Sequence, residues 1–261
     1  GVTLALVEHP LDDDEQAVSD LVPPLRPAAL AAAGDRWHRA ATISPCGTVT
    51  DVMPGQPVRP PRVSLEIATG VAHMRLTRPD KRNAIDRDMA VALAETVAQI
   101  ERARDVRAVL ISADGPTFTV GGDLEYIGSR LVDLPGELDA MIGPFHTALT
   151  QLAALPVPVV CAVQGGAAGG GLGLLWCADV VLAADDLKIA LGFARLGLSG
   201  DGGSSWALPR LVGLRRARQL LLLDRPLDAS EALDWGVVDR VVAADRLQAE
   251  AAELAGRLAD G

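Results

Sequence analysis

The sequence predicts an α/β fold, because segments with the two-residue period of strands alternate with segments of helical period. Residues 63–76 alternate apolar and polar side chains, break at Thr69-Gly70 and alternate again, which is the pattern of a β-hairpin. Residues 86–104 then carry apolar side chains at helical spacing, with Asp86 as the candidate N-cap. The short apolar run RAVLIS at 107–112 follows as a buried strand.

The rest of the chain continues this alternation of strands and helices. The further elements are expected, in chain order, as a helix at 139–152, strands at 157–165, 179–185 and 188–193, a helix–turn–helix at 206–223, and last elements at 228–235 and 245–258. Connected strand and helix units of this kind form one α/β domain over residues 63–261.

Residues 1–62 differ from this domain in composition. They mix acidic, proline and alanine residues, contain one candidate helix around Arg26–Ala33, and end in the proline-rich stretch MPGQPVRPP. Such a stretch is typical of an extended linker. We therefore expect an N-terminal extension joined to the domain, either as a loosely packed arm or as a regulatory or partner-binding segment.

The composition limits the classes of function. Apolar residues make up 49% of the chain and charged residues 22%, as in ordinary globular proteins, and the net charge is −10. This acidity argues against nucleic acid and anionic membrane surfaces as partners, but a local basic cluster could still bind a small anion. Three cysteines in no ligand spacing indicate a reducing compartment, with neither a disulfide framework nor a metal site. Without a signal segment or an apolar stretch long enough to span a bilayer, a cytoplasmic protein is expected.

Two glycine-rich junctions are the first candidates for chemistry. QGGAAGGGLG at 164–173 and FTVGGDL at 118–124 each follow a predicted buried strand and precede a predicted helix. Glycine lets a ligand approach the bare backbone, and the first N–H groups of a helix have no partner within it. Two such junctions could direct two N–H donors at one oxygen, as an oxyanion hole does. Each stretch taken alone is equally consistent with an ordinary tight turn.

Charged side chains supply the other candidates. RPDKRNA at 78–84 concentrates positive charge in an acidic chain, and is either a solvated turn or an anion-binding patch. His146 lies on a predicted helix, where a histidine is more often a surface or structural residue than a catalytic one. Asp201 stands between glycines in GLSGDGGSSW, either as a solvated turn residue or as an acid held in place for chemistry.

Taken in this order, the segments resemble the crotonase superfamily of enoyl-CoA hydratases and isomerases over residues 63–258. The resemblance is carried by RPDKRNAI, FTVGGDL, VPVVCAVQGGAAGGGLGL, GLSGDGGSSWALPRLVG and ASEALDWGVVDRVV. It implies a spiral of ββα turns with surrounding helices, and an acyl-CoA thioester as substrate, with CoA as part of that substrate and no separate cofactor. It also implies that the N–H groups of Gly122 and Gly170 hold the thioester oxygen.

The resemblance further implies what surrounds the substrate and how the chain assembles. It assigns the CoA end to Arg78, Lys81, Arg82 and Asn83, with the backbone at Val120, Asp123 and Leu124. It also implies a homotrimer or a dimer of trimers, although the sequence ends at Gly261, where the family normally continues into C-terminal helices that cover the active site and build the trimer.

Two departures from the family pattern bear on the reaction. The hydratases carry one glutamate after the glycine run and a second before the later GL block, and these positions are Gly173 and Phe193 here. Phe193 is therefore expected beside the acyl group. Asp201 instead matches the single aspartate of a branch that includes the epoxyphenylacetyl-CoA and 3-enoyl-CoA isomerases and, further off, the 4-chlorobenzoyl-CoA dehalogenases.

These departures leave several functions open. The expected activity is that of an enoyl-CoA isomerase, in which Asp201 takes a proton from C2 and returns it to C4 while the oxyanion hole stabilises the enolate. The alternatives are a hydrolytic dehalogenase with Asp201 as nucleophile and His146 activating water, a weak hydratase, and a non-catalytic acyl-CoA-binding subunit.

Overall fold

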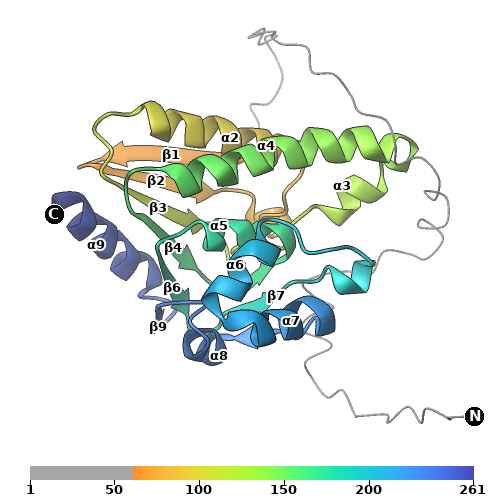
Figure 1. Cartoon of the computed structure of the whole chain (residues 1–261). Coiled ribbons are helices and arrows are strands. Elements are labelled where there is room, and N and C mark those ends of the chain that lie inside the picture. The colour runs from red at the N-terminus through yellow and green to blue at the C-terminus, as the bar shows by residue number, and fades with distance from the viewer. Residues whose placement is uncertain (1–60) are drawn as a thin grey trace, which may run out of the picture.

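The computed structural model describes residues 61–261, whose larger β-sheet has six strands in the order β1-β2-β3-β4-β6-β9 (Figure 1). β1 pairs with β2 antiparallel, as the predicted hairpin requires, and every other neighbouring pair is parallel. The expected helix around Arg26–Ala33 and the extension up to residue 60 lie outside the described residues. The strands are β1 (Val63–Ala68), β2 (Val71–Leu76), β3 (Ala108–Ala113), β4 (Val159–Val163), β6 (Val180–Ala184) and β9 (Arg240–Val242).

Helices cover both faces of this sheet, and this explains why its central strands are apolar. All residues of β3 and β4 are buried, as expected for strands that are covered on both sides. α2 (Arg87–Arg102) and α4 (Leu134–Ala154) lie together over one face (Figure 1). α9 (Leu247–Asp260) packs on the other face through small residues such as Ala251 and Ala255.

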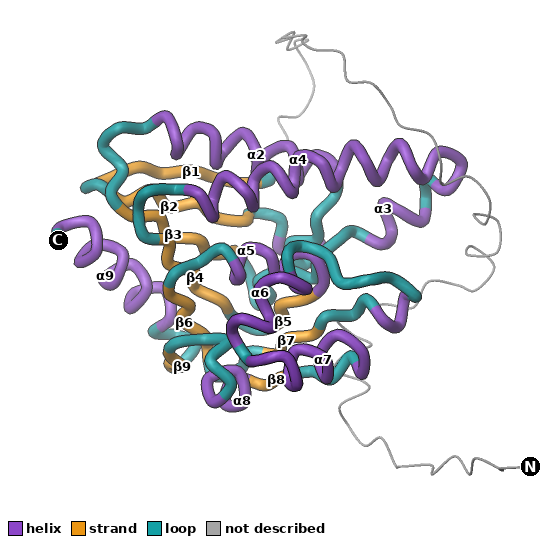
Figure 2. The backbone as a smooth tube through the Cα atoms, in the orientation of Figure 1, coloured by secondary structure: helices purple, strands orange, loops and turns teal. Residues whose placement is uncertain are grey.

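A three-stranded sheet in the order β5-β7-β8 continues the fold beside the larger one (Figure 2). Only Gln164 and Gly165 separate its first strand from β4, so the chain passes directly from one sheet into the other. Its strands are β5 (Gly166–Ala168), β7 (Lys188–Ala190) and β8 (Leu227–Asp228). The helices in this part of the chain are α5 (Gly173–Trp176), α6 (Ser204–Leu211), α7 (Gly213–Leu223) and α8 (Ala229–Asp234).

The sequence predicted most of these elements, but it did not predict strands β5, β8 and β9, and it misplaced some element ends. α2 begins after Asp86, whose side chain accepts a hydrogen bond from the N–H of Met89 at 2.9 Å, so the predicted N-cap is confirmed. α4 begins at Leu134 rather than at residue 139. The predicted strand at 188–193 is wrong in its last part, because Gly192 adopts a φ of 73°, which lies outside the β region.

The part of the chain that the structure describes contains no helix long and apolar enough to cross a membrane. Its two cysteines are free thiols, Cys161 fully buried and Cys177 half-buried. Burial raises the pKa of Cys177 to about 11 and also raises the pKa of Cys161. Both stay protonated at neutral pH, so neither is an activated nucleophile. Cys46 lies outside the described residues.

Candidate active site

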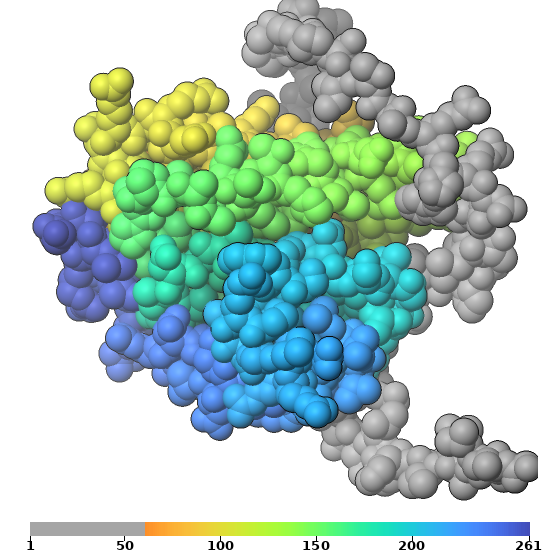
Figure 3. All heavy atoms as spheres, in the orientation of Figure 1, coloured from red at the N-terminus to blue at the C-terminus, as the bar shows by residue number. Residues whose placement is uncertain are grey.

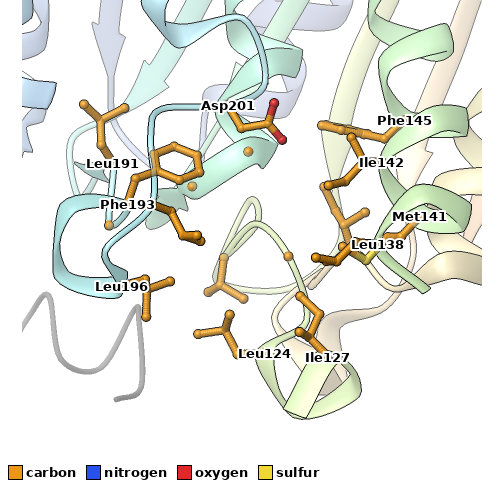
Figure 4. A pocket seen from close by; sticks show the side chains of 17 residues that line it. Leu124, Ile127, Leu138, Met141, Ile142, Phe145, Leu191, Phe193, Leu196 and Asp201 are labelled. Carbon is orange, nitrogen blue, oxygen red and sulfur yellow. The ribbon is translucent and has the colours of Figure 1, made fainter. Parts of the chain in front are cut away.

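An apolar cavity of about 140 Å³ lies between α3 (Leu124–Gly128), α4 and the loop that follows β7 (Figure 4). Aliphatic and aromatic side chains form most of its wall, and Asp201 is the one ionisable residue among the described residues that line it. An apolar part of a ligand in this cavity would therefore lie beside a single carboxylate. The lining residues are Ile85, Val120, Gly122, Leu124, Ile127, Leu138, Met141, Ile142, Phe145, Gly169, Gly170, Leu191, Gly192, Phe193, Leu196, Leu198 and Asp201.

The two glycine-rich junctions meet in the wall of this cavity. Gly122 and Gly170 both line it. A Cβ added to Gly121 would lie 2.8 Å from the carbonyl oxygen of Ala168 and 3.2 Å from the amide nitrogen of Gly170. The first distance is shorter than real Cβ atoms show, so only glycine permits this approach of the two backbones.

The amide of Gly122 lies between two residues that bond to Ile85. The parallel bridge between Gly122 and Ile85 uses the carbonyl of Gly121, which accepts from the Ile85 N–H at 2.7 Å. It also uses the N–H of Asp123, which donates to the Ile85 carbonyl at 2.9 Å. Neither bond involves the amide of Gly122. An N–H placed beside the second junction can donate to a carbonyl oxygen that gains negative charge.

Asp201 lies directly against the second glycine junction. Gly202 adopts a φ of 60°, and a Cβ added there would collide with the carbonyl oxygen of Gly170. The loop therefore packs backbone to backbone on the junction, which only glycine allows. Oδ2 of Asp201 lies 4.0 Å from the position of a Cβ on Gly170. The acid is thus held next to an amide that lines the cavity.

His146 holds the other oxygen of this carboxylate. Its Nε2 lies 2.8 Å from Oδ1 of Asp201. The two residues come from α4 and from the chain before α6, and these parts of the chain are coloured green and blue in the space-filling view (Figure 3). The imidazole is exposed and is not part of the cavity wall, whereas the neighbouring Phe145, with its ring centroid 6.4 Å away, does line the cavity. His146 therefore reaches Asp201 rather than the cavity.

The two positions that carry glutamates in the hydratases have no carboxylate here and differ in their surroundings. Gly173 is buried, and a Cβ added there would lie 2.5 Å from Cδ1 of Leu149 and 2.8 Å from the carbonyl oxygen of Gly202. No side chain fits at this position without displacing the loop that carries Asp201. Phe193 is half-buried and lines the cavity, so an apolar surface occupies the second position (Figure 4).

Gly173→Ala is expected to lower the free energy of unfolding by about 1–3 kcal/mol, because overpacking forces neighbouring atoms to move. Turnover should fall as well, since the displaced backbone includes Gly202. Thermal and denaturant unfolding measure the effect. Gly143→Ala is the control, because a Cβ there would meet nothing within 4 Å. An unchanged unfolding midpoint for Gly173→Ala would contradict this steric account.

The basic segment at 78–84 has two parts, and the first is structural. Arg78 is 7% exposed and forms ion pairs with Asp86 at 3.1 Å and with Asp123 at 2.9 Å. Asn83 is fully buried, accepts from the N–H of Arg78 at 2.9 Å and donates to two backbone carbonyls. The side chains of Arg78 and Asn83 are thus bonded within the protein, and the expectation that these residues line the CoA end stays a prediction.

The second part of the basic segment, Lys81 and Arg82, lines another cavity of about 240 Å³. Glu125 lines this cavity too, and its Oε2 lies 2.8 Å from Nζ of Lys81, a hydrogen bond that raises the pKa of the exposed amine. The apolar cavity thus lies next to a charged one. The residues that line both cavities are Val120, Gly122 and Leu124.

The sequence pointed to the polar residues of the site and to Val120, Leu124 and Phe193, but it missed the rest of the apolar wall. Leu138, Met141, Ile142 and Phe145 line the cavity from one face of α4 (Figure 4). Their spacing of three and four residues is visible in the sequence, but it does not say what the face contacts. The residues from the loop after β7 have no periodic signal at all.

An apolar cavity in a two-sheet α/β fold, with two glycine junctions and one carboxylate in its wall, defines an acyl-CoA enzyme of the crotonase type. The chain belongs to the enoyl-CoA hydratase/isomerase family, whose pattern matches residues 66–261. The predicted family, fold and enzyme class are therefore confirmed.

Known relatives and solved structures agree with this assignment. The chain is 39% identical over 197 residues to 1,2-epoxyphenylacetyl-CoA isomerase of Escherichia coli K12, with 74% of each chain covered. It is 34% identical over 200 residues to 4-chlorobenzoyl coenzyme A dehalogenase-2 of an Arthrobacter species, covering 76% of this chain and 72% of the other. The solved structure of an enoyl-CoA hydratase from Mycobacterium avium subsp. paratuberculosis K-10 matches with a TM-score of 0.70 at 32% identity, covering 78% of this chain and 80% of that one.

Proposed function

We propose that the protein is an enoyl-CoA isomerase that moves a carbon–carbon double bond by transferring one proton through Asp201. The observation that carries the proposal is that Asp201 is the one ionisable side chain among the described residues that line the acyl cavity, where it lies beside Gly170. A single carboxylate can remove a proton and return it, whereas the family's hydration chemistry uses a second group to hold and activate water. Gly173 and Phe193 supply no such group.

In the proposed reaction, the N–H groups of Gly122 and Gly170 donate hydrogen bonds to the thioester oxygen. Asp201 takes a proton from C2, and the electrons of that C–H bond pass into an enolate that the two amides stabilise. The same proton is then delivered to C4, so the double bond moves from C3–C4 to C2–C3. No atom is gained or lost, and the carboxylate ends as it began.

We place the CoA portion of the substrate at the second cavity. Lys81 and Arg82 line it together with the carboxylates of Asp80, Asp123 and Glu125, and the two basic side chains are the groups that could bind phosphate. Gly122 lines both cavities, so a thioester at that amide would have its acyl group in the apolar cavity and its CoA in the charged one. The substrate brings CoA with it, and the proposed proton transfer uses no other cofactor.

The proposal is tested by incubating the full chain with 3-enoyl-CoA thioesters and following the absorbance of the conjugated 2-enoyl product. Chromatography of the products separates the candidate activities. We expect 2-enoyl-CoA and no 3-hydroxyacyl-CoA. Accumulation of the hydroxyacyl product would show hydration, and binding of acyl-CoA without any turnover would show a non-catalytic role.

Substitutions of His146 test how much its hydrogen bond to Asp201 contributes to the rate. His146→Ala is expected to lower kcat by about 3- to 10-fold, because one hydrogen bond contributes roughly 0.5–1.5 kcal/mol. His146→Gln should keep most of the rate, since its amide N–H can still donate to Oδ1 of Asp201. Initial rates at saturating substrate measure both. If the glutamine variant loses at least as much activity as the alanine variant, the imidazole itself moves a proton.

A second candidate, hydrolytic dehalogenation, is favoured by the 2.8 Å contact between His146 and Asp201. In this reaction a carboxylate oxygen of Asp201 attacks the halogen-bearing ring carbon and halide leaves. Water activated by His146 then hydrolyses the resulting ester at the aspartyl carbonyl. Single turnover of 4-chlorobenzoyl-CoA in ¹⁸O-labelled water is the test, since the first product would carry unlabelled oxygen from Asp201. Absence of halide release excludes this candidate.

A further inference from the structure

Asp224 is a buried carboxylate that does not line the acyl cavity. It follows the last residue of α7, is 4% exposed, and has a φ of 52°, in the left-handed region that favours glycine. Glycine would meet this backbone requirement at a lower cost, and a buried carboxylate is unfavourable unless it is paired. The presence of an aspartate here is therefore best explained by what its side chain contacts.

The carboxylate of Asp224 ties one wall of the acyl cavity to α7. Oδ1 accepts a hydrogen bond from the N–H of Gly192 at 2.6 Å, and Oδ2 lies 3.1 Å from Nε of Arg195, an ion pair that lacks hydrogen-bond geometry. Phe193 stands between these two contacts, and its ring lines the cavity together with Leu191 (Figure 4). One side chain thus fixes the chain on both sides of the ring.

The segment that carries Phe193 lies beyond the end of β7, so strand pairing does not hold it in place. β7 ends at Ala190. In the following turn, the N–H groups of Leu196 and Leu198 both donate to the carbonyl of Phe193 at 3.0 Å. These bonds shape the turn but do not connect it to a neighbouring element. Asp224 provides such a connection.

We propose that Asp224 is a positioning residue that sets the acyl specificity of the enzyme by holding Phe193 against the acyl group. The proposal rests on the proposed function, since it takes the apolar cavity as the site of the acyl part of an acyl-CoA. Asp224 acts through Gly192 and Arg195 and is absent from the cavity wall. Its loss should change how tightly and how selectively acyl groups bind, with little effect on proton transfer at Asp201.

Two substitutions separate the contacts of Asp224. Asp224→Gly keeps the left-handed backbone and removes both contacts. Asp224→Asn also suits that backbone and keeps an oxygen for the N–H of Gly192, but it removes the charge that pairs with Arg195. Thr69→Gly is the matched control, because it also removes a side chain at a φ of 50° but lies in the turn between β1 and β2. Thermal unfolding of each full chain confirms that it is folded.

The measurements are kcat and KM for 3-enoyl-CoA thioesters of increasing acyl length, and dissociation constants for the matching saturated acyl-CoA esters. For Asp224→Gly we expect KM for the preferred acyl group to rise about tenfold, the scale of one lost hydrogen bond to a charged group. The preference among acyl lengths should flatten, with kcat nearly unchanged. Asp224→Asn should fall between this variant and the unaltered protein, and Thr69→Gly should match the unaltered protein.

Two outcomes for Asp224→Gly would overturn the specificity role: an unchanged acyl-length preference, or a fall in kcat at constant KM. If this variant does not fold, Asp224→Asn and Arg195→Gln decide the question by the same criteria. Failure of the unaltered protein to bind any saturated ester would reject the proposed function, and the specificity role with it. Binding without isomerisation would reject the isomerase alone, and the dissociation constants would still test Asp224.

Discussion

Asp201→Asn is expected to lower kcat for double-bond isomerisation by roughly 10²–10⁴-fold, the usual contribution of a general acid–base group. Asparagine has nearly the same shape and can still contact His146, but its amide cannot accept the proton from C2. No other carboxylate lines the apolar cavity within the described residues, so none is placed to replace it. Initial rates give kcat, and titration with a saturated acyl-CoA should show binding that is unchanged within about threefold, since the carboxylate acts on the reacting carbons.

Asp139→Asn is the matched control for this result. Asp139 is an exposed carboxylate on α4 that does not line the cavity, so its loss should leave the rate as it is. Near-normal turnover of Asp201→Asn would mean that another group carries the proton. A parallel loss of acyl-CoA binding would mean instead that the substitution had disturbed the loop.

Arg78→Met is expected to lower the free energy of unfolding by about 3–5 kcal/mol, because removing one partner of a buried ion pair leaves the other charge uncompensated. Two buried carboxylates are affected here: Asp123 loses its ion pair, and Asp86 keeps only the longer one with Arg62 at 3.4 Å. Each also caps a helix, since Asp86 accepts from an N–H of α2 and Asp123 from an N–H of α3. Denaturant unfolding monitored by circular dichroism measures the loss.

Arg87→Met, at an exposed arginine at the start of α2, controls for the loss of positive charge and should cost less than about 1 kcal/mol. Because α3 forms part of the cavity wall, Arg78→Met should also weaken acyl-CoA binding in the fraction that remains folded. If Arg78→Met were as stable as Arg87→Met, the buried ion pairs of Arg78 would not contribute to the free energy of unfolding.

Local sequence patterns were enough to predict most of the fold. The hairpin at 63–76 and helix α2 are confirmed because their period and cap are set by neighbouring residues. The start of α4 was missed although Asp133 at the N-cap and a proline in the first turn are both helix start signals. The end of β7 was missed because the left-handed φ of Gly192 interrupts a run of apolar residues.

The site was harder to predict, since burial depends on partners that are distant in sequence. A basic run looks the same whether it is solvated or paired, and the ion pair of Arg78 with Asp123 could not be foreseen. The contact between His146 and Asp201 spans 55 positions and has no local signal. The roles of Asp201, Gly122 and Gly170, the oligomeric state and the compartment stay predictions.

The placement of Asp201 on one side of the cavity has a stereochemical consequence for the proposed reaction. His146 engages Oδ1, and Oδ2 lies on the side of Gly170. The planar dienolate would therefore meet a single proton carrier, on one of its two faces. In the proposed reaction the proton would leave C2 and reach C4 on that same face, so the double-bond shift would be suprafacial and each prochiral carbon would exchange one defined hydrogen.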